Sequence, residues 1–297
     1  MVEPAQEPAQ EKPSLFWSIF IIGGANLIIA SAFFVAAIPT LFVIGALAVL
    51  DILLVVFVLI GLKRHEKVKD KDLSATTFSR KMFNIISGLI FGFFIWLFNP
   101  LMALFILLGI DFAFAFHEFA YAVIKKKTYF TDAFIALGRQ SEPFKPYLAS
   151  IMALFGFSIV LCFQTFMFQL HFGSVIFSNV VIIVYVATIL IWGIGDTAAY
   201  FAGTRYGDHK LPYNKKKSWE GFFANAVVGT GLGILFFAVF LPLFTPITCP
   251  FILWLPLSLC GGFVGAFFES VNLHLDDNFV TVTAVGLILG LLVIILL

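Results

Sequence analysis

Acidic and basic side chains suited to phosphate chemistry gather in the C-terminal part of this chain, at the ends of long apolar segments. The basic residues of this group are Arg205, Lys210 and Lys215–Lys217, all within the segment Gly195–Gly221, GDTAAYFAGTRYGDHKLPYNKKKSWEG. Carboxylate oxygens are ligands that Mg²⁺ prefers, and Mg²⁺ bridges phosphates, which lysines bind directly. If these segment ends meet at one membrane face, they predict a phosphate-binding site with a divalent cation. The acidic residues concerned are Asp196, Glu220, Glu269, Asp276 and Asp277.

The segment Gly195–Gly221 has two features of an anion site. Its small residues allow the backbone to approach a ligand or another helix closely. Ser218 stands directly before a predicted helix and can cap its N-terminus, and a helix N-terminus preceded by lysines attracts anions. A basic loop that only sets membrane topology is the alternative. The residues predicted to bind phosphate here are Gly203, Gly207, Lys216, Lys217 and Ser218.

A second polar segment, Glu269–Thr283 with the sequence ESVNLHLDDNFVTVT, precedes the last apolar run. Asp276, Asp277 and Asn278 form a dense group of oxygen atoms at the start of that run. Placed opposite Asp196, they predict a site for a metal and a triphosphate, with Asp196, Asp276 and Asp277 as metal ligands and Asn278 on the nucleotide. Taken alone, the same residues could be a helix cap at the membrane interface.

The composition indicates that lipid is the solvent of this chain. Apolar residues make up 61% of it and charged residues 12%, against about 25% charged in soluble proteins. Mean hydropathy is +1.04. A helix crosses a bilayer with roughly 20 apolar residues, and the apolar runs predict an all-α, polytopic transmembrane bundle of about nine spans. The predicted spans are 15–37, 39–62, 81–98, 100–122, 148–170, 174–195, 219–243, 250–271 and 279–297.

The chain is expected to form one integral membrane domain, residues 14–297, in which 195–278 carries the motifs. Residues 1–13 are polar and rich in proline, which predicts a disordered tail. A short amphipathic piece at about 197–206 is expected to follow the sixth span. The longest polar loop, 123–147, is too short for a soluble domain.

The distribution of positive charge predicts the topology. With nine spans, all 18 Lys and Arg fall on one side of the membrane or at span ends that face it. Cytoplasmic loops carry an excess of Lys and Arg, so this side, the N-terminus and the predicted site are expected to face the cytoplasm. Arg80 and Lys81 open the third span on the same side.

Other ionisable residues lie within or beside predicted spans. Asp51 lies in the second span, and Asp111 and Glu118 are seven residues apart on one helix face, with His117 adjacent. Structural hydrogen bonding between helices would explain Asp51, and a position at the membrane interface would explain His117 and Glu118. Ionisable residues inside spans are also typical of transporters. A transporter would not explain why the acidic residues and lysines of the C-terminal segments meet at one membrane face.

These motifs resemble those of the polyprenol kinase family, which includes dolichol kinase, phytol kinase and CTP-dependent diacylglycerol kinase. Arg80–Lys81 also resembles the family's RK…H…G signature, although Asn84 stands where the family has His. The matching residues of the C-terminal motifs are Gly195, Asp196, Ala199, Gly203, Gly207, Lys217, Ser218, Glu220 and Gly221, then Glu269, Asp276, Asp277 and Asn278.

The resemblance implies transfer of the γ-phosphate of CTP to a lipid alcohol that enters from the bilayer, with Mg²⁺ as cofactor. Arg80 and Lys81 would contact phosphate, and Glu220 or Glu269 would orient the hydroxyl or act as base. No nucleic acid partner is expected, and a homodimer is compatible with the sequence. The chain has no GxxxxGK[ST] loop of the ATPase type. The residues expected to be catalytic are Asp196, Glu220, Glu269 and Asp277.

The first motif also resembles phosphatidate cytidylyltransferase, a CDP-lipid synthase in which a lipid phosphate attacks the α-phosphate of CTP. Tyr200 and Trp219 suit that family well. Its long C-terminal signature with HGG is missing, and no Lys or Arg follows Lys217. A synthase is therefore the alternative to the kinase, and a transporter is the alternative outside the enzymes.

Overall fold

The computed structural model describes residues 14–35, 73–131, 147–247, 249–273 and 275–297. The predicted tail, the second predicted span and Asp51 lie outside these residues. Regular structure in the described part is helical, and its only strand-like pairing is one isolated bridge between Lys210 and Ser218. The helices are α1 (Leu15–Val35), α3 (Leu73–Phe98), α4 (Pro100–Ala122), α6 (Leu148–Tyr206), α7 (Trp219–Ile234), the π-helical turn η1 (Leu235–Phe240), α8 (Leu241–Phe244), α9 (Phe251–Ser270) and α10 (Asp277–Leu296).

Six helical segments of the described chain are long and apolar enough to cross a membrane. Two shorter apolar stretches, Leu15–Ala30 and Gly88–Phe98, accompany them. The all-helical, polytopic class is thus confirmed, whereas the count of nine spans and the orientation stay predictions. The six segments are Pro100–Ala122, Leu148–Gly173, Ile176–Tyr206, Trp219–Phe244, Phe251–Ser270 and Asp277–Leu296.

Helix α6 contains two of these segments. They meet at Gly173, whose φ of 72° belongs to the left-handed region that glycine adopts easily. The predicted separate piece at 197–206 is wrong, because the second segment continues without a break to Tyr206. Alanines favour helix here, and the hydroxyl of Thr197 donates to the carbonyl of Gly193 at 2.7 Å, so its polar group is satisfied within the helix.

The chain folds into two compact units. The first consists of Met1–Thr76 and Gly109–Leu148, and the second of Thr77–Leu108 and Ala149–Leu297. In the first unit, Glu118 accepts a hydrogen bond from the backbone of Tyr147 at 3.0 Å, and the ring of that tyrosine stacks on His117. Glu118 and His117 are therefore engaged in packing within the first unit.

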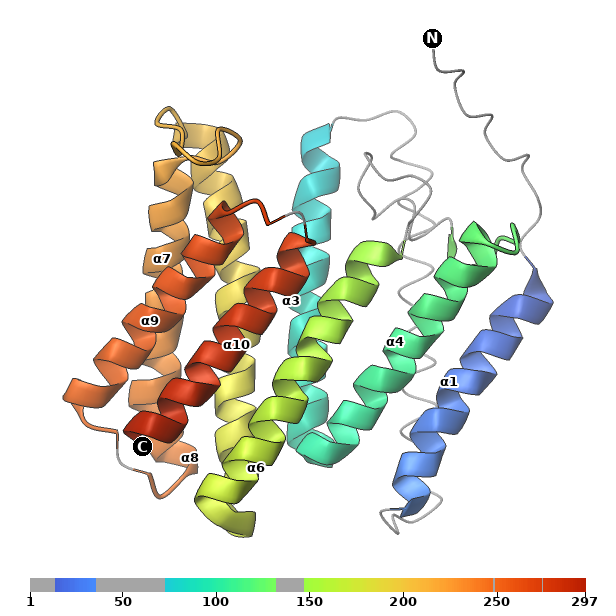
Figure 1. Ribbon diagram of the computed structural model, residues 1–297, viewed down its shortest axis with the longest axis horizontal. Coiled ribbons are helices and arrows are strands. Elements are labelled where there is room, and N and C mark those ends of the chain that lie inside the picture. The colour runs from blue at the N-terminus through green and yellow to red at the C-terminus, as the bar shows by residue number, and fades with distance from the viewer. Residues whose placement is uncertain (1–13, 36–72, 132–146, 248, 274) are drawn as a thin grey trace. The chain divides into compact units, whose positions relative to one another are not determined.

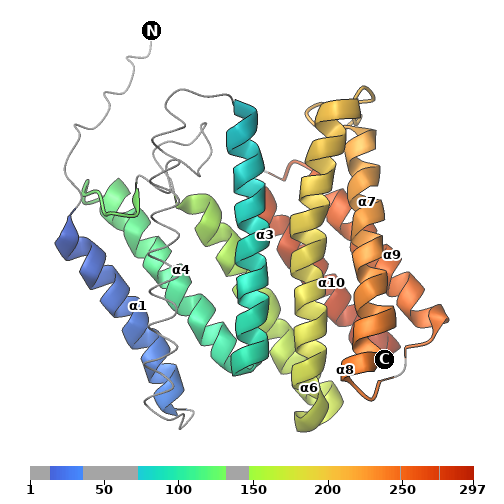
Figure 2. The same ribbon diagram turned by 180° about the vertical axis from the view of Figure 1, so that it is seen from behind.

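The second unit is a helical bundle in which the segment Ile176–Tyr206 of α6 is the most buried span. Helix α3 packs closely against it, since a Cβ on Gly88 would lie 2.2 Å from Ile189. Helix α9 approaches the same segment at Gly265, where a Cβ would lie 3.2 Å from Ile191. Figures 1 and 2 show α7, α9 and α10 alongside it in this unit.

The direction of each helix brings the predicted site residues to one end of this bundle. The C-terminal ends of α6 and α9 and the N-terminal ends of α3, α7 and α10 lie together there (Figure 1). Glu269 is in the last turn of α9, and Asp196 and Lys81 lie about two to three turns inside α6 and α3. Segments that are far apart in the sequence can therefore share one site.

Helices α7 and α9 touch backbone to backbone. A Cβ on Gly229 would lie 2.8 Å from the Cα of Gly262, and a Cβ on Gly262 would lie 2.5 Å from the carbonyl oxygen of Ala226. Small residues at such crossings are the usual means by which membrane helices associate tightly. The contact fixes the position of Glu269, two turns further along α9, relative to the start of α7.

Replacing Gly262 with Ala should therefore lower the thermal midpoint of the protein in detergent. Overpacking of this kind costs about 1–3 kcal/mol. Gly231→Ala, on α7, is the matched control, because a Cβ there would meet no atom within 4 Å. Equal midpoints for the two variants would show that the backbone contact does not hold these helices together.

Candidate functional site

The loop between α6 and α7 is folded by its own hydrogen bonds. The backbone of Leu211 donates to Lys217 at 3.0 Å, and that of Trp219 donates to His209 at 2.9 Å. Asn214 donates from its side chain to the backbone carbonyl of Ser270 at 2.9 Å, which ties the loop to the end of α9. The loop thus holds its lysines over the end of the bundle.

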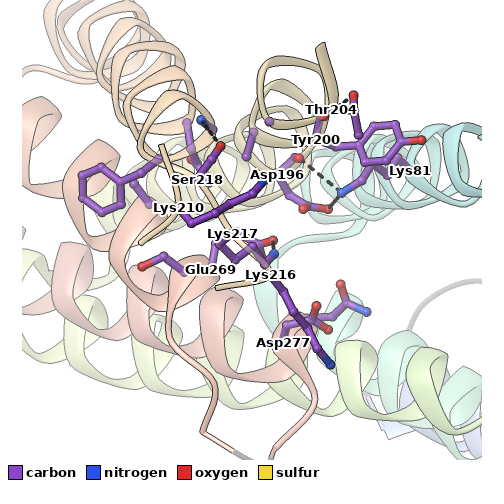
Figure 3. A pocket seen from close by; sticks show the side chains of 18 residues that line it. Lys81, Asp196, Tyr200, Thr204, Lys210, Lys216, Lys217, Ser218, Glu269 and Asp277 are labelled. Carbon is purple, nitrogen blue, oxygen red and sulfur yellow. Dashed lines mark hydrogen bonds and ion pairs between the residues drawn. The ribbon is translucent and has the colours of Figure 1, made fainter. Parts of the chain in front are cut away.

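A cavity of about 340 Å³ lies beneath this loop, wholly within the second unit (Figure 3). Its volume falls within the range of small-molecule sites. Five parts of the chain contribute: α3, α6, the loop with the start of α7, α9, and the start of α10. The lining residues are Lys81, Asp196, Ala199, Tyr200, Gly203, Thr204, Lys210, Lys216, Lys217, Ser218, Gly221, Phe222, Asn225, Ala266, Glu269, Ser270, Asp277 and Asn278.

Lys81 and Asp196 form a buried ion pair across α3 and α6. The ammonium nitrogen lies 2.5 Å from a carboxylate oxygen, and the two side chains are 7% and 13% exposed. The same ammonium donates to the backbone carbonyl of Asp196 at 3.2 Å and lies 5.4 Å from the ring centre of Tyr200. In this low-dielectric environment the ammonium of Lys81 and the carboxylate of Asp196 neutralise each other.

Lys217 and Glu269 form a second ion pair, between the loop and α9. Burial alone would lower the pKa of Lys217, but the surrounding carboxylates, with Glu269 first, raise the pKa above its usual range. Asp196 and Asp277 contribute to the same effect. Lys217 therefore stays charged and joins three carboxylates from three helices.

The N-terminus of α7 faces the cavity with a capped first turn. The hydroxyl of Ser218 accepts a hydrogen bond from the backbone of Gly221 at 3.2 Å, so the predicted cap is confirmed. Gly207 and Gly221 allow α6 and α7 to cross closely here, since a Cβ on Gly221 would lie 2.9 Å from the carbonyl of Ala199. Lys210 donates to the carbonyl of Gly207 at 2.7 Å.

Most of the predicted site residues meet around this cavity. Gly207 lies beside it in the crossing of α6 and α7, and Arg80 lies in α3, next to Lys81. The predicted residues that line the cavity are Lys81, Asp196, Gly203, Lys216, Lys217, Ser218, Glu269, Asp277 and Asn278.

Glu220, predicted as a catalytic residue, is not among the residues that line the cavity. One of its carboxylate oxygens lies 2.5 Å from Nδ1 of His209, an exposed side chain on the loop. Hydrogen bonding to Glu220 raises the pKa of His209 above its usual value. In this arrangement Glu220 fastens the loop to the first turn of α7.

Asp276, predicted as a metal ligand, caps α10. Its carboxylate accepts a hydrogen bond from the backbone of Asn278 at 2.9 Å, and it does not line the cavity. Among the residues that the structure describes, no three His, Cys, Asp or Glu side chains are arranged to hold a metal ion. The predicted trio of Asp196, Asp276 and Asp277 is therefore not formed in the described part of the chain.

The cavity still suits a cation that arrives with its own phosphate ligands. Mg²⁺ in nucleotide sites is commonly held by one or two carboxylates together with substrate phosphates. Asp196 and Asp277 both line the cavity and both act on Lys217. Oxygen donors of the required type are thus present on two sides of the same space.

Several lining residues escaped prediction from the sequence. Tyr200, Thr204 and Ser270 lie close to predicted residues along α6 and α9, so helical spacing could have found them. Asn225 is seven residues after Ser218, on the same face of α7. An amide in an otherwise apolar helix was the available signal for this residue.

Comparisons with known proteins give one partial relative. The chain is 36% identical over 95 residues to "CTP-dependent diacylglycerol kinase 1" of Eremothecium gossypii. The match covers 28% of this chain and 30% of that protein, so it spans less than a third of the relative's own length. No protein-family profile matches the chain, and no solved structure matches it.

The fold and the site together define a class. Six long apolar helical segments among the described residues identify an integral membrane protein, and its second unit has a cavity lined by charged side chains at one end. The partial relative agrees with this class.

The Lys81–Asp196 pair predicts a strong stability effect. Lys81→Met should destabilise the protein by about 3–5 kcal/mol, because it leaves Asp196 buried without its counter-ion. Adding Asp196→Asn to that variant should recover much of the loss. The free energy of unfolding in detergent measures both effects.

The control for this comparison is Lys215→Met, which changes an exposed loop lysine outside the cavity lining. It should leave the unfolding free energy close to that of the unchanged protein. If Lys81→Met is no more destabilising than Lys215→Met, the buried pair does not support the fold.

Proposed function

We propose that this protein is a membrane-embedded lipid kinase that transfers the γ-phosphate of CTP to a lipid alcohol. The observation that carries the proposal is a single cavity, at one end of a bundle of membrane-spanning helices, lined by lysines and carboxylates from five parts of the chain. The name of the partial relative, a CTP-dependent diacylglycerol kinase, supports both the nucleotide and the class of acceptor.

The triphosphate would bind on the loop side of the cavity. Lys210, Lys216 and Lys217 lie there, next to the N-terminus of α7, and a helix N-terminus favours negative charge. Lys81 approaches from α3, and Arg80, its neighbour in the sequence, is the further cation expected to contact phosphate. Phosphate oxygens would form ion pairs with lysines that are paired with carboxylates in the absence of the nucleotide.

The carboxylates released in this way would hold Mg²⁺ with the phosphates, and Asp196 and Asp277 are the residues we assign to it. When bound, the cation would neutralise negative charge on the β- and γ-phosphates. Phosphoryl transfer depends on this neutralisation and on positioning more than on covalent help from the protein.

The reaction forms one bond and breaks one. The hydroxyl oxygen of the lipid bonds to the γ-phosphorus while the bond from that phosphorus to the β–γ bridging oxygen breaks, and CDP leaves with the electron pair. We assign the hydroxyl proton to Glu269, which lines the cavity. Glu220, the other candidate base, does not line the cavity and contacts His209 through one carboxylate oxygen.

The acceptor would reach the cavity from the bilayer, because the cavity lies where membrane-spanning helices end. Diacylglycerol, polyprenols such as dolichol, and phytol-like isoprenoids all present a hydroxyl on an apolar chain. The loop side of the cavity would face the cytoplasm, where CTP is available, in agreement with the placement of Lys and Arg.

Transfer of label from CTP tests the proposal. Purified protein in lipid vesicles containing dioleoylglycerol, dolichol, phytol and dioleoylphosphatidate should move radiolabel from the γ-position of CTP into lipid, and none from the α-position. Lipid labelling from the α-position alone would replace the kinase by a CDP-lipid synthase. Absence of transfer from either position would favour a transport protein.

The same assay identifies the residues. Lys217→Met should reduce transfer by roughly 100-fold or more, because a charge-assisted contact to phosphate is lost and Glu269 is left without its partner. Lys215→Met, outside the cavity lining, should retain activity. Equal activity of the two variants would remove Lys217 from the site.

A further inference from the structure

One face of α7 lines the cavity for two helical turns. Ser218, Gly221, Phe222 and Asn225 are spaced as residues that share a helix face, and all four line the cavity. Asn225 is the furthest of them from the loop and lies within the span Trp219–Phe244. It is therefore a polar group on the membrane side of the cavity, away from Lys210 and Lys216.

Asn225 is buried with an unused hydrogen-bonding atom. The residue is 1% exposed, and its side-chain oxygen has no hydrogen-bond partner among the described residues. Buried polar atoms are nearly always paired, so an unpaired one on a residue that lines a cavity is able to take a partner from a ligand. The neighbouring apolar lining, Phe222 and Ala266, offers no polar atom of a side chain.

The side-chain oxygen of Asn225 packs closely against α6, where a glycine accommodates it. A Cβ on Gly195 would lie 2.3 Å from the side-chain oxygen of Asn225, and a Cβ on Gly265 would lie 3.7 Å from it. Gly195 directly precedes Asp196. The amide is thus seated against the part of α6 that carries the cavity's buried carboxylate.

We propose that Asn225 binds the hydroxyl group of the lipid acceptor and thereby selects an uncharged alcohol. This rests on the proposed function and specifies its acceptor site. The side-chain oxygen accepts a hydrogen bond from the lipid O–H, and the amide N–H groups can donate to the hydroxyl oxygen. The hydroxyl is held on the membrane side, and the lysines hold the phosphates on the loop side.

The same geometry disfavours an acceptor that already carries a phosphate. A doubly ionised phosphate monoester has no O–H to donate to the amide oxygen. It would also bring a second doubly charged group beside the triphosphate, and like charges repel in a low-dielectric site. Lys210, Lys216 and Lys217 belong to the loop, and Lys81 is already paired with Asp196, so no unpaired lysine of the lining is placed on α6 or α7 beside Asn225.

Binding of a lipid alcohol and of its methyl ether, without nucleotide, tests the role of Asn225 apart from catalysis. Protein in lipid nanodiscs is titrated with fluorescent dioleoylglycerol and with the methyl ether of the same lipid, which lacks the O–H. The unchanged protein should bind the alcohol about tenfold more tightly than the ether, a difference expected for one well-placed buried hydrogen bond.

Two variants of equal bulk separate hydrogen bonding from packing. Asn225→Ala should abolish the preference for the alcohol, and Asn225→Ser, whose hydroxyl can still pair, should retain part of it. Thr281→Val is the matched control, because Thr281 is equally buried with an unpaired side-chain oxygen but does not line the cavity. It should keep the full preference.

The outcomes are distinct. No preference in the unchanged protein, or an equal preference in the Ala variant, would overturn the assignment of Asn225. Loss of preference in both the Ala and the Ser variants would also overturn it, because packing would then be the cause. Failure of label transfer from CTP would refute the kinase. The binding preference for the alcohol, which is measured without nucleotide, would still decide whether Asn225 contacts the hydroxyl.

In the transfer assay, Asn225→Ala should raise the KM for the lipid alcohol by about tenfold and leave the KM for CTP nearly unchanged. A parallel rise in both constants would indicate a distorted cavity and contradict a specific contact with the acceptor.

Discussion

Charge neutralisation inside an apolar bundle is the constraint on which the second unit depends. Lys81 and Asp196 are buried together, and Lys217 is held by Glu269 between the loop and the end of α9. A single ionised group in this setting is strongly unfavourable, so each pair requires its two helices or its loop to stay in place. The glycine contacts between helices allow the approach, and the ion pairs determine which ends must meet.

The same pairs explain how the site can bind a charged ligand without a large rearrangement. Lysines that are neutralised by carboxylates can be neutralised equally by phosphates, and the carboxylates can then pair with a divalent cation. Lys217 is central to this exchange, because Glu269, Asp196 and Asp277 all raise its pKa. A nucleotide with its metal would replace internal ion pairs by ion pairs to the ligand, so that each buried charge keeps an opposite charge beside it.

Much of this arrangement could be predicted from residue types and periodicity. Apolar runs located the described helices to within a few residues, except at the start of α3 and the end of α6, and Ser218 was identified as a cap because its position precedes a helical pattern. The direction of individual side chains was not predictable. Glu220 turns to His209 and Asp276 caps α10, because short-range partners that are invisible to spacing compete for these carboxylates. Asn225 was missed because a single amide in an apolar helix shows that a polar group is present but not which neighbours it faces.

Nucleotide binding to the purified protein tests the central claim, which is that these paired charges form one nucleotide site. Calorimetric titration with CTP and Mg²⁺ should show saturable binding, weakened by about tenfold or more in Lys217→Met and unchanged in Lys215→Met, since a charged contact to phosphate contributes about 1.5–3 kcal/mol. Binding of equal strength in the unchanged protein and Lys217→Met, or no binding of CTP to the unchanged protein, would contradict it.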